Sequence, residues 1–368
     1  MRIIVNTSNL SHGGGLQVAI SFIEMCRGYK ENEYIIFLSP TIKKQLLIDG
    51  YSNNFHFFLI KDKPLPYTLK GQKSIRYLRK LEKNIKPDCV FTVFGPTYWK
   101  PLVPHLMGFA LGHFIYNDSP FFDLISIKEK LFWEIRKHIK MHYVKQDAFY
   151  YHVETEDAKI RLSLSLKCSL DNIFVLSNTY NTVYEGFKPK NNVLAKKRKG
   201  EFRFIYISAY YKHKNFEILN QIIPVLKRKG YNDITFILTI EEQVYEEIFT
   251  ENAKSQILNI GPVKVEDCPQ LYYECDAVFV PSVLEIFTAN YPEAMKMSKP
   301  ILTTNLSSAK TICENAALYF DALNYNDAVD KVVQLVQDKT LQNQLITNGN
   351  KRLSSFLTPH EKASGILQ

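Results

Sequence analysis

Two carboxylates, Glu285 and Glu293, stand eight positions apart where a strand is expected to meet a helix. The apolar run Asp276–Val280 is typical of a buried parallel strand, and the residues after Pro292 indicate a helix that begins near this proline. Glu285 is therefore expected in the loop at the carboxyl end of a strand, where open α/β sheets bind ligands. Backbone amides of residues 287–291 favour an anion at the start of the helix. Carboxylates that bind hydroxyl groups, next to amides that bind phosphate, would suit a nucleotide-sugar as the ligand.

The same residues allow simpler interpretations. Asn290 and Glu293 have the spacing of a capping box, in which Asn290 is the N-cap and Glu293 has only a structural role. Glu285 is equally compatible with a solvated loop carboxylate. The spacing alone leaves these alternatives open.

The wider sequence context of the two carboxylates resembles a known family. Glu285-x7-Glu293, with Pro-Ser before it and Ala-Met after it, is similar to the E-x7-E signature of retaining glycosyltransferases with the GT-B fold, family 4 type, which includes bacterial polysaccharide and lipopolysaccharide glycosyltransferases. Residues 260–263, 271–277 and 299–304 follow in the order usual for that family. The resemblance is strong over residues 200–322 and weaker before them.

This resemblance implies a role for each residue near the carboxylates. Glu285 would bind a hydroxyl group of the donor sugar, and Glu293 would bind the ribose hydroxyls. Lys214 would neutralise the diphosphate, helped by backbone amides. The amides belong to Phe287, Thr288 and Ala289, and Thr288 stands where relatives often carry glycine. Retention of configuration on one face of the sugar requires no enzyme nucleophile, because the leaving phosphate assists deprotonation of the acceptor.

The lysine-rich run Ser208–Asn215 departs from the family pattern. Relatives usually carry an arginine, then four residues, a lysine and a glycine. Lys214 matches the lysine, but Ala209 replaces the arginine and Asn215 replaces the glycine. Half of the phosphate clamp is therefore missing, and Lys212 is a candidate for supplying the lost charge. A Lys-His-Lys run at a helix start is otherwise typical of a solvated surface.

Further candidates come from outside these two segments. The Gly-rich turn after the first strand resembles the glycine loop that faces the donor in the family, so Gly14 and Gly15 are candidate donor contacts; a tight strand-to-helix connection is the alternative. His113 follows an apolar strand where many relatives place a histidine that contacts the donor sugar, and a buried structural histidine is equally open. Val263 resembles the position that flanks the nucleotide base, with apolar packing as its alternative.

The length and the alternation of patterns predict the fold class. At 368 residues the chain is expected to form two domains. Short apolar runs alternate with helical patterns in both halves, which predicts βαβ units and parallel sheets. We therefore predict an α/β protein of two Rossmann-like domains facing across a cleft, the GT-B arrangement. The predicted boundaries are 1–190 for an acceptor domain, 191–355 for a nucleotide-sugar donor domain and 356–368 for a segment that crosses back to the first domain, with 186–200 as the linker.

The net charge of +9 is unevenly distributed. Residues 1–200 hold 30 Lys and Arg against 17 Asp and Glu, whereas residues 201–368 hold 16 against 20. The basic half indicates an anionic partner. A membrane face or a diphosphate-linked lipid acceptor explains the asymmetry at least as well as nucleic acid, for which no motif occurs. Two basic stretches, 70–86 and 121–145, carry apolar residues that face either the domain core or anionic lipid.

No metal or cofactor is predicted, and the nucleotide-diphosphate sugar is expected as a substrate. No Asp-x-Asp sequence occurs, and the residues expected to hold the phosphates are cations. The six cysteines are scattered without ligand spacing, and no apolar run has the length of a membrane span. We expect a cytoplasmic protein, peripheral on the inner face of the plasma membrane.

Three functions are compatible with these observations. The first is a retaining, metal-independent glycosyltransferase that extends a glycan or lipid-linked oligosaccharide in cell-surface polysaccharide biosynthesis, such as capsule or lipopolysaccharide. The second is a nucleotide-sugar epimerase of the same fold. The third is a catalytically silent nucleotide-sugar-binding subunit, for which Ala209 is the best argument.

Overall fold

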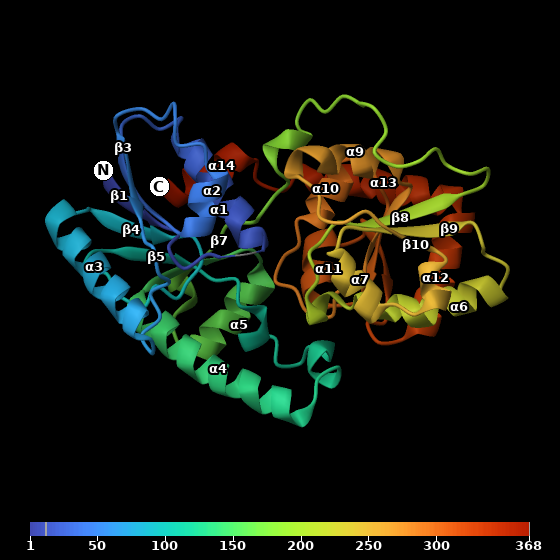
Figure 1. The fold of residues 1–368 in the computed structure, drawn as a ribbon, viewed down its shortest axis with the longest axis horizontal. Coiled ribbons are helices and arrows are strands. Elements are labelled where there is room, and N and C mark those ends of the chain that lie inside the picture. Colours follow the sequence, from blue (N-terminus) through green and yellow to red (C-terminus); the bar gives the residue numbers. More distant parts are fainter. Residues whose placement is uncertain (12, 368) are drawn as a thin grey trace. The chain divides into compact units, whose positions relative to one another are not determined.

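The computed structural model describes residues 1–11 and 13–367, which form two compact units (Figure 1). The first unit contains Met1–Asn117, Ser126–Ser177 and the residues from Pro359 onward. The second contains Asp118–Ile125 and Asn178–Thr358. Each unit has its own parallel sheet and its own hydrophobic core.

Seven parallel strands form the sheet of the first unit in the order β3-β2-β1-β4-β5-β6-β7. Buried apolar residues dominate the central strands because helices cover both faces of the sheet. The register pairs Ile3 of β1 with Tyr34 of β2 on one side and with Cys89 of β4 on the other. The strands are β1 (Arg2–Asn6), β2 (Glu33–Leu38), β3 (Phe55–Leu59), β4 (Cys89–Thr92), β5 (His105–Gly108), β6 (Tyr150–Val153) and β7 (Ile173–Val175).

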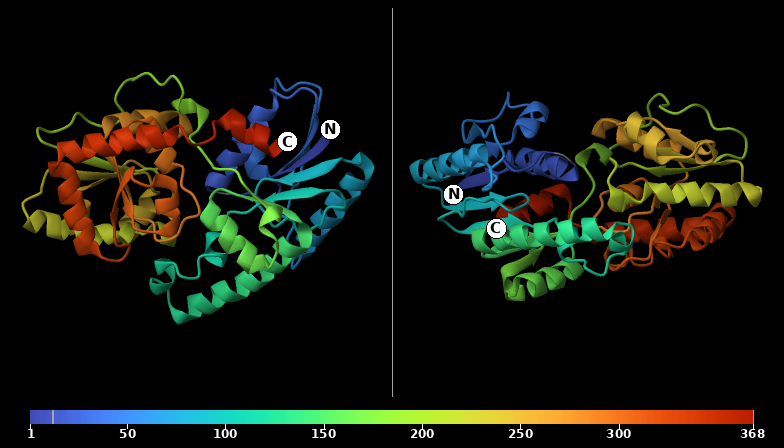
Figure 2. Two further views of the ribbon diagram at one scale, coloured as in Figure 1. Left: turned by 180° about the vertical axis from the view of Figure 1, so that it is seen from behind. Right: turned by 60° about the horizontal axis from the view of Figure 1, so that its bottom comes forward.

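Helices cover both faces of this sheet (Figures 1 and 2). One face carries α1 (Gly14–Cys26), α2 (Pro40–Gln45) and α14 (Pro359–Leu367), and Ala363 of α14 joins the core beneath α1. The other face carries α3 (Leu69–Ile85), α4 (Ile127–Asp147) and α5 (Glu156–Leu166). Side-chain caps fix the starts of these three helices: Thr68 accepts from the amide of Gly71, Ser126 forms a capping box with Glu129, and Thr155 accepts from the amide of Ala158.

The two basic helices α3 and α4 bury different amounts of apolar surface. The stripe of α3 faces the core, where Ile75 and Leu78 are buried. On α4 only Val144 and Asp147 are buried. The prediction that an apolar stripe faces the core therefore holds for α3 and fails for most of α4. Within the described part of the chain, no helix has the length and apolar character that crossing a membrane requires.

The second unit has a six-stranded parallel sheet in the order β10-β9-β8-β11-β12-β13. Its strands are β8 (Phe202–Tyr206), β9 (Ile234–Leu238), β10 (Ile257–Asn259), β11 (Ala277–Val280), β12 (Ile301–Thr304) and β13 (Ala317–Phe320). Its helices are α6 (Leu219–Arg228), α7 (Glu242–Ile248), α8 (Glu251–Lys254), α9 (Cys268–Glu274), α10 (Asn290–Lys296), α11 (Ser307–Cys313), α12 (Tyr325–Gln337) and α13 (Lys339–Leu353).

The strand order shows that both units are Rossmann-like. In each sheet the first strand lies at the centre, the next two extend to one side and the later strands extend to the other. The prediction of an α/β chain with two Rossmann-like domains is therefore confirmed. In the second unit the order reverses between β8 and β11, and this switch point is where such sheets bind ligands.

Two segments lie differently from the sequence-based expectation. The expected linker packs on α9, because Glu274 accepts from the amides of Val193 and Leu194, and Leu194 is buried in the core. The segment Asp118–Ile125 groups with the second unit although it comes from the N-terminal half. Phe121 of this segment is buried, and a local reading of the chain gives no signal for this long-range packing.

Candidate functional site

Two loops meet at the carboxyl edge of the second sheet, one after β8 and one after β11. Val283 N donates to His213 O at 2.8 Å, and Asn215 Nδ2 donates to Pro281 O at 3.3 Å. The hydroxyl groups of Tyr206 and Ser282 lie 2.7 Å apart. These contacts fix the loops against each other at the point where the strand order reverses.

Lys214 and Glu285 form an ion pair across the two loops. Their side chains are 12% and 10% exposed, so neither is a solvated surface group. Burial alone would lower the pKa of the Lys214 ammonium, but the Glu285 carboxylate outweighs this effect and raises that pKa overall. Lys214 is therefore a permanent cation near neutral pH, which suits neutralisation of phosphate charge rather than proton transfer.

The backbone explains the asparagine that replaces the usual glycine after Lys214. Asn215 has φ 53° and ψ 42°, the left-handed conformation that glycine adopts freely and asparagine tolerates better than most residues. The turn geometry of the glycine is thus kept. Ala209 and Lys212 are both exposed, in contrast to Lys214. Position 209, where relatives carry arginine, therefore contributes no positive charge to the loop.

Glu293 lies in a polar network on α10. The Tyr272 hydroxyl is 3.0 Å from Glu293 Oε2 and 3.0 Å from Asn290 Oδ1. Asn290 Nδ2 in turn donates to Ile207 O, at the end of β8, at 3.0 Å. Burial raises the pKa of Glu293 to about 7, although the hydrogen bond from Tyr272 opposes this shift. Glu293 therefore changes protonation within the pH range of ordinary assays.

The capping-box interpretation of Asn290 and Glu293 is wrong. Ala289 is the N-cap of α10, and it provides no side-chain cap. Glu293 N donates to Ala289 O at 3.0 Å, an ordinary helical bond, so Glu293 lies one position beyond the N3 site of a capping box. The Asn290 side chain points instead to Ile207 and Tyr272, and this network holds the helix against β8 and α9.

The loop between β11 and α10 leaves its backbone amides available. Val283 N and Tyr291 N donate to backbone oxygens, at 2.8 and 3.3 Å. Among the described residues, no acceptor takes the amides from Leu284 to Asn290, which include the predicted donors Phe287, Thr288 and Ala289. Thr288 is buried and its hydroxyl accepts from Asn290 Nδ2 at 3.2 Å. Its side chain therefore stabilises the loop while the amides remain free.

The remaining predicted site residues lie in other places. Val263 packs against the core of the second unit, so its apolar alternative describes what the structure shows. Gly14 and Gly15 begin α1 of the first unit, and a Cβ on Gly15 would approach the Phe94 ring to 3.3 Å. His113, also in the first unit, stacks on Trp133 with ring centroids 4.2 Å apart. These three residues belong to the first unit, whereas Lys214 and Glu285 belong to the second.

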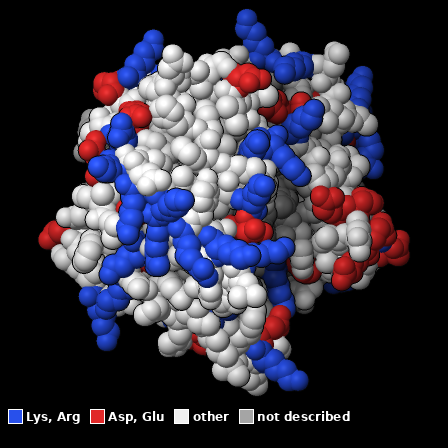
Figure 3. All heavy atoms as spheres, turned by 60° about the vertical axis from the view of Figure 1, so that its left-hand side comes forward, with Lys and Arg blue, Asp and Glu red and all other residues white. Residues whose placement is uncertain are grey.

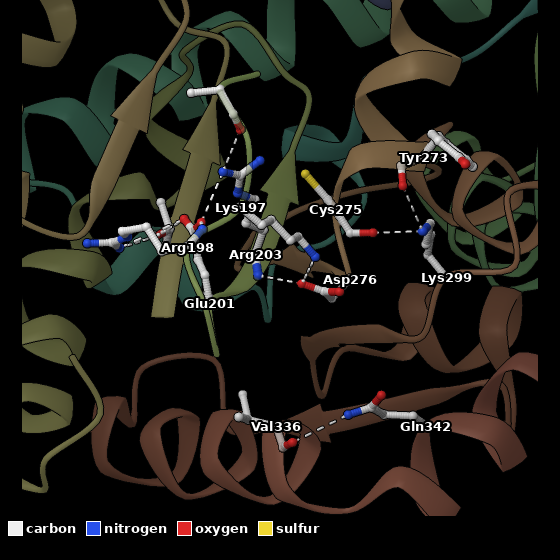
Figure 4. A network of polar contacts seen from close by, with 12 residues as sticks. Lys197, Arg198, Glu201, Arg203, Tyr273, Cys275, Asp276, Lys299, Val336 and Gln342 are labelled. Atoms are coloured by element: carbon white, nitrogen blue, oxygen red, sulfur yellow. Dashed lines mark hydrogen bonds and ion pairs between the residues drawn. The ribbon is translucent and has the colours of Figure 1, made fainter. Parts of the chain in front are cut away.

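A second set of ion pairs lies at the opposite, amino edge of β8 and β11, where the Arg203–Glu201 pair is buried and the side chains of the Lys197–Asp276 pair are 35% and 29% exposed (Figure 4). Asp276 accepts from Lys197 Nζ at 2.5 Å and from the Arg203 amide at 2.8 Å. Glu201 accepts from Arg203 Nη2 at 3.0 Å and from Thr235 at 2.8 Å. Each acid here accepts hydrogen bonds from two or more neighbours within the unit.

Sequence reasoning missed the residues that hold the site in place. Tyr272 lies within the stretch 271–277 that already resembled the family, and this is the only local signal for it. Ser119 belongs to the segment 118–125, which groups with the second unit, and its hydroxyl donates to Val283 O at 2.6 Å. No local pattern in the sequence predicts this contact. Within the described residues, no group of three or more His, Cys, Asp or Glu side chains is arranged to hold a metal ion.

Comparisons with known proteins place these observations in a family context. Residues 188–352 match the family model of glycosyl transferases group 1. No curated protein sequence matches the chain. Solved structures match over its full length. They include Anabaena Alr3699/HepE in complex with UDP-glucose (TM-score 0.72, 13% identity, 100% of this chain and 99% of that one).

Two further structures share the fold at low identity. Sucrose-phosphate synthase from Thermosynechococcus elongatus has a TM-score of 0.74 at 15% identity, covering 100% of this chain and 98% of that one. WaaG, a glycosyltransferase involved in lipopolysaccharide biosynthesis, has a TM-score of 0.75 at 10% identity, with the same coverage. The chain therefore has the GT-B fold of these enzymes, and its second unit carries the group 1 match.

Proposed function

We propose that this protein is a retaining glycosyltransferase that moves a sugar from a nucleotide-diphosphate sugar to a glycan acceptor. The observation that carries the proposal is the buried Lys214–Glu285 pair at the switch point of the second sheet. The group 1 match over this unit supports it, as does the UDP-glucose complex of HepE. Glu293 and the free loop amides lie on the same edge of the sheet.

The proposed chemistry follows from the charges at this edge. As the bond between the sugar and the diphosphate breaks, negative charge develops on the leaving phosphate, and Lys214 and the amides of residues 287–289 stabilise it. Glu285 holds Lys214 and accepts from a hydroxyl of the donor sugar. The acceptor oxygen forms its bond to the anomeric carbon on the face that the phosphate leaves, and the leaving phosphate oxygen takes the acceptor's proton. The configuration is therefore retained and no enzyme nucleophile is required. Lys214 and the amides supply the positive charge that a metal ion would otherwise give.

Glu293 would bind the ribose of the donor. An ionised carboxylate accepts from two neighbouring hydroxyl groups, whereas the protonated form loses part of this capacity. The Tyr272–Asn290 network orients the carboxylate for this task. Donor binding should therefore strengthen as the pH rises through about 7, the pKa of Glu293.

The acceptor that we propose is a lipid-linked oligosaccharide of cell-surface polysaccharide biosynthesis. The excess of Lys and Arg in residues 1–200 supports an anionic, diphosphate-linked acceptor. The similarity of the fold to WaaG, named for lipopolysaccharide biosynthesis, is compatible with this role. The protein would then work on the cytoplasmic face of the plasma membrane.

The test begins with the donor class. Thermal unfolding is measured with UDP, GDP, ADP and CMP, since a nucleotide that binds only the folded chain raises its melting temperature. Nucleotide-sugars of the nucleotide that raises the melting temperature most are then incubated with lipid-linked acceptors, and the release of free nucleotide is measured. Glu285→Gln should lower acceptor-dependent release about 100- to 1,000-fold, whereas the matched change of the exposed Glu266, Glu266→Gln, in the same unit should leave it unchanged.

The absence of a charged side chain at Ala209 favours one rival function, a binding subunit without turnover. Nucleotide binding without release of nucleotide in the presence of any acceptor would support this rival. Interconversion of the donor sugar without acceptor would instead identify an epimerase. Either result would contradict the proposed transfer.

A further inference from the structure

The outer side of α4 exposes a continuous row of apolar side chains. In this 21-residue helix, Ile127, Leu131, Ile135 and Ile139 follow one another at intervals of four, which places them along one side of the helix. Together with Phe132 they are between 44% and 85% exposed. We refer to these five residues as the α4 stripe. Soluble proteins rarely expose contiguous apolar surface of this kind unless it contacts a partner.

The α4 stripe faces solvent, whereas the apolar side of an ordinary surface helix faces the core. In α3, on the same face of the sheet, the apolar residues Ile75 and Leu78 are buried and the cations point outward. In α4 the apolar residues point outward. The partly buried side contacts the rest of the unit through Trp133, which stacks on His113 with ring centroids 4.2 Å apart, and through Lys140, which lies 5.8 Å from the ring centroid of Phe114. The stripe is therefore free of the core of its own unit.

Lys and Arg are numerous on α4 itself and on α3, which covers the same face of the sheet. Figure 3 shows Lys and Arg gathered on one face of the molecule with few Asp or Glu among them. On α3, Arg76, Arg79, Lys80 and Lys83 line a shallow groove together with Asn84. The helix α3 contains six Lys or Arg against one acid, and α4 contains six against three. An exposed apolar row on a helix rich in Lys and Arg is the composition of a helix that lies in a lipid interface.

We propose that the α4 stripe inserts into the interface of an anionic lipid membrane, with the cations of α3 and α4 facing the lipid headgroups. Charge complementarity selects this occupant. A second copy of the chain docked on the same face would bring two cationic surfaces together, which is unfavourable. The link between this membrane contact and a lipid-linked acceptor rests on the proposed function. The membrane contact itself is independent of that function.

The test measures binding of the full chain to sedimented vesicles of phosphatidylglycerol and phosphatidylcholine, compared with vesicles of phosphatidylcholine alone. The double variant Ile127→Ser/Leu131→Ser removes two exposed side chains of the α4 stripe. Affinity for the anionic vesicles should fall on the order of 30-fold, because two apolar side chains no longer leave water. The control variant Leu47→Ser/Leu323→Ser changes two exposed leucines elsewhere and should bind like the wild type.

A second pair of substitutions tests the electrostatic part. Lys80→Gln/Lys83→Gln on α3 should weaken binding to anionic vesicles about tenfold at low salt. This difference should shrink as salt is added, since screening reduces the attraction of exposed charges. Binding to neutral vesicles should be weak for every variant.

The readouts separate this inference from the proposed function. The stripe variant should keep the nucleotide-induced rise in melting temperature and its transfer to a water-soluble acceptor analogue. Equal binding of wild type and stripe variant to anionic vesicles would overturn the inference. A wild-type dimer in solution that the stripe substitutions dissociate would also overturn it, in favour of a second copy. Loss of nucleotide binding in the wild type would contradict the proposed function and leave the vesicle result intact.

Discussion

The two edges of β8 and β11 each carry one buried ion pair, Arg203–Glu201 at the amino edge and Lys214–Glu285 at the carboxyl edge, in different surroundings. At the amino edge, Glu201 and Asp276 accept hydrogen bonds from Arg203, Lys197 and Thr235 within one network (Figure 4). At the carboxyl edge, Lys214 and Glu285 hold each other beside a loop whose backbone amides, among the described residues, have no acceptor. At the amino edge the acids contact donors of their own network, whereas the carboxyl edge retains backbone donors for a ligand.

This difference shows that a buried ion pair is not by itself a sign of function. Buried pairs commonly serve only to satisfy each other. What distinguishes the carboxyl edge is its place at the switch point, the unused amides and a partly buried acid, Glu293, with a pKa of about 7. The following substitutions test whether the two edges separate catalysis from stability.

The largest expected effect is on the turnover of Glu285→Gln. The variant should lose about 100- to 1,000-fold in kcat, because Lys214, which stabilises charge in the transition state, loses the carboxylate that holds it. Some stability should also be lost, since Lys214 remains buried without its carboxylate. Steady-state kinetics with the identified donor measures the first effect, and urea unfolding measures the second.

The double variant Lys214→Met/Glu285→Leu sharpens this result. It removes both buried charges, so much of the lost stability should return. Activity should stay as low as in Glu285→Gln. Recovery of activity together with stability would show that the pair is structural, like its counterpart at the amino edge.

The amino edge should respond in the opposite way. Glu201→Gln should lower the free energy of unfolding by about 3 kcal/mol, because the buried Arg203 guanidinium loses its charged partner. The kcat should remain that of the wild type. Urea unfolding and kinetics on the same preparation check both statements, and a fall in kcat larger than the fall in folded protein would contradict them.

The contribution of Glu201 to the free energy of unfolding depends on pH, and the sign of this dependence follows from its pKa. Burial alone would raise the pKa of Glu201, but hydrogen bonds from Arg203, the Arg198 amide and Thr235 lower it from 4.5 to about 2. Its stabilising contribution is therefore complete above pH 4.5 and is lost as the pH falls toward 2. The free energy of unfolding of Glu201→Gln should therefore not show this loss between pH 4.5 and pH 2.

Glu293 should show the opposite pH dependence, with a smaller effect. Because its folded-state pKa rises from 4.5 to about 7, the wild type should lose stability as the pH rises between these values. Glu293→Gln should therefore gain about 2 kcal/mol relative to the wild type across this interval, after allowance for partial exposure. Unfolding curves at pH 4, 6 and 8 test this, and parallel curves for the two proteins would refute it.

The smallest expected effect concerns the backbone after Lys214. Asn215→Ala should cost about 1 kcal/mol of stability, since alanine is strained at φ 53°. Asn215→Gly should cost less, because glycine adopts this conformation freely and loses only the bond to Pro281. Melting temperatures of the two variants check the order, and a more stable alanine variant would contradict the assignment.

The sequence predicted the fold well because its signals are local. The short apolar runs Arg2–Asn6, Ile234–Leu238 and Ile301–Thr304 form β1, β9 and β12, and α5 begins at a Thr cap, Thr155. The parallel topology followed from strands alternating with helices. The exposed stripe of α4 could not be predicted in the same way, since periodicity shows which residues share a helix face but not whether that face is covered.

The candidate site was predictable only in part. Glu285, Glu293 and Lys214 were found because their spacing matches a family pattern. The pairing of Lys214 with Glu285, and the Tyr272–Asn290 network, depend on strands that are adjacent in space and distant in sequence. The sequence likewise could not show that Asn290 contacts Ile207 rather than capping α10, because both uses need the same residue at the same position.

The central claim is that the carboxyl edge of β8 and β11 binds the diphosphate of a nucleotide. Titration calorimetry of the preferred nucleoside diphosphate with wild type, Lys214→Met and Lys197→Met tests it most directly. We predict a Kd about 100-fold weaker for Lys214→Met, from loss of a buried charge contact, and an unchanged Kd for Lys197→Met at the amino edge. Equal affinity of wild type and Lys214→Met, with both proteins folded, would contradict the account.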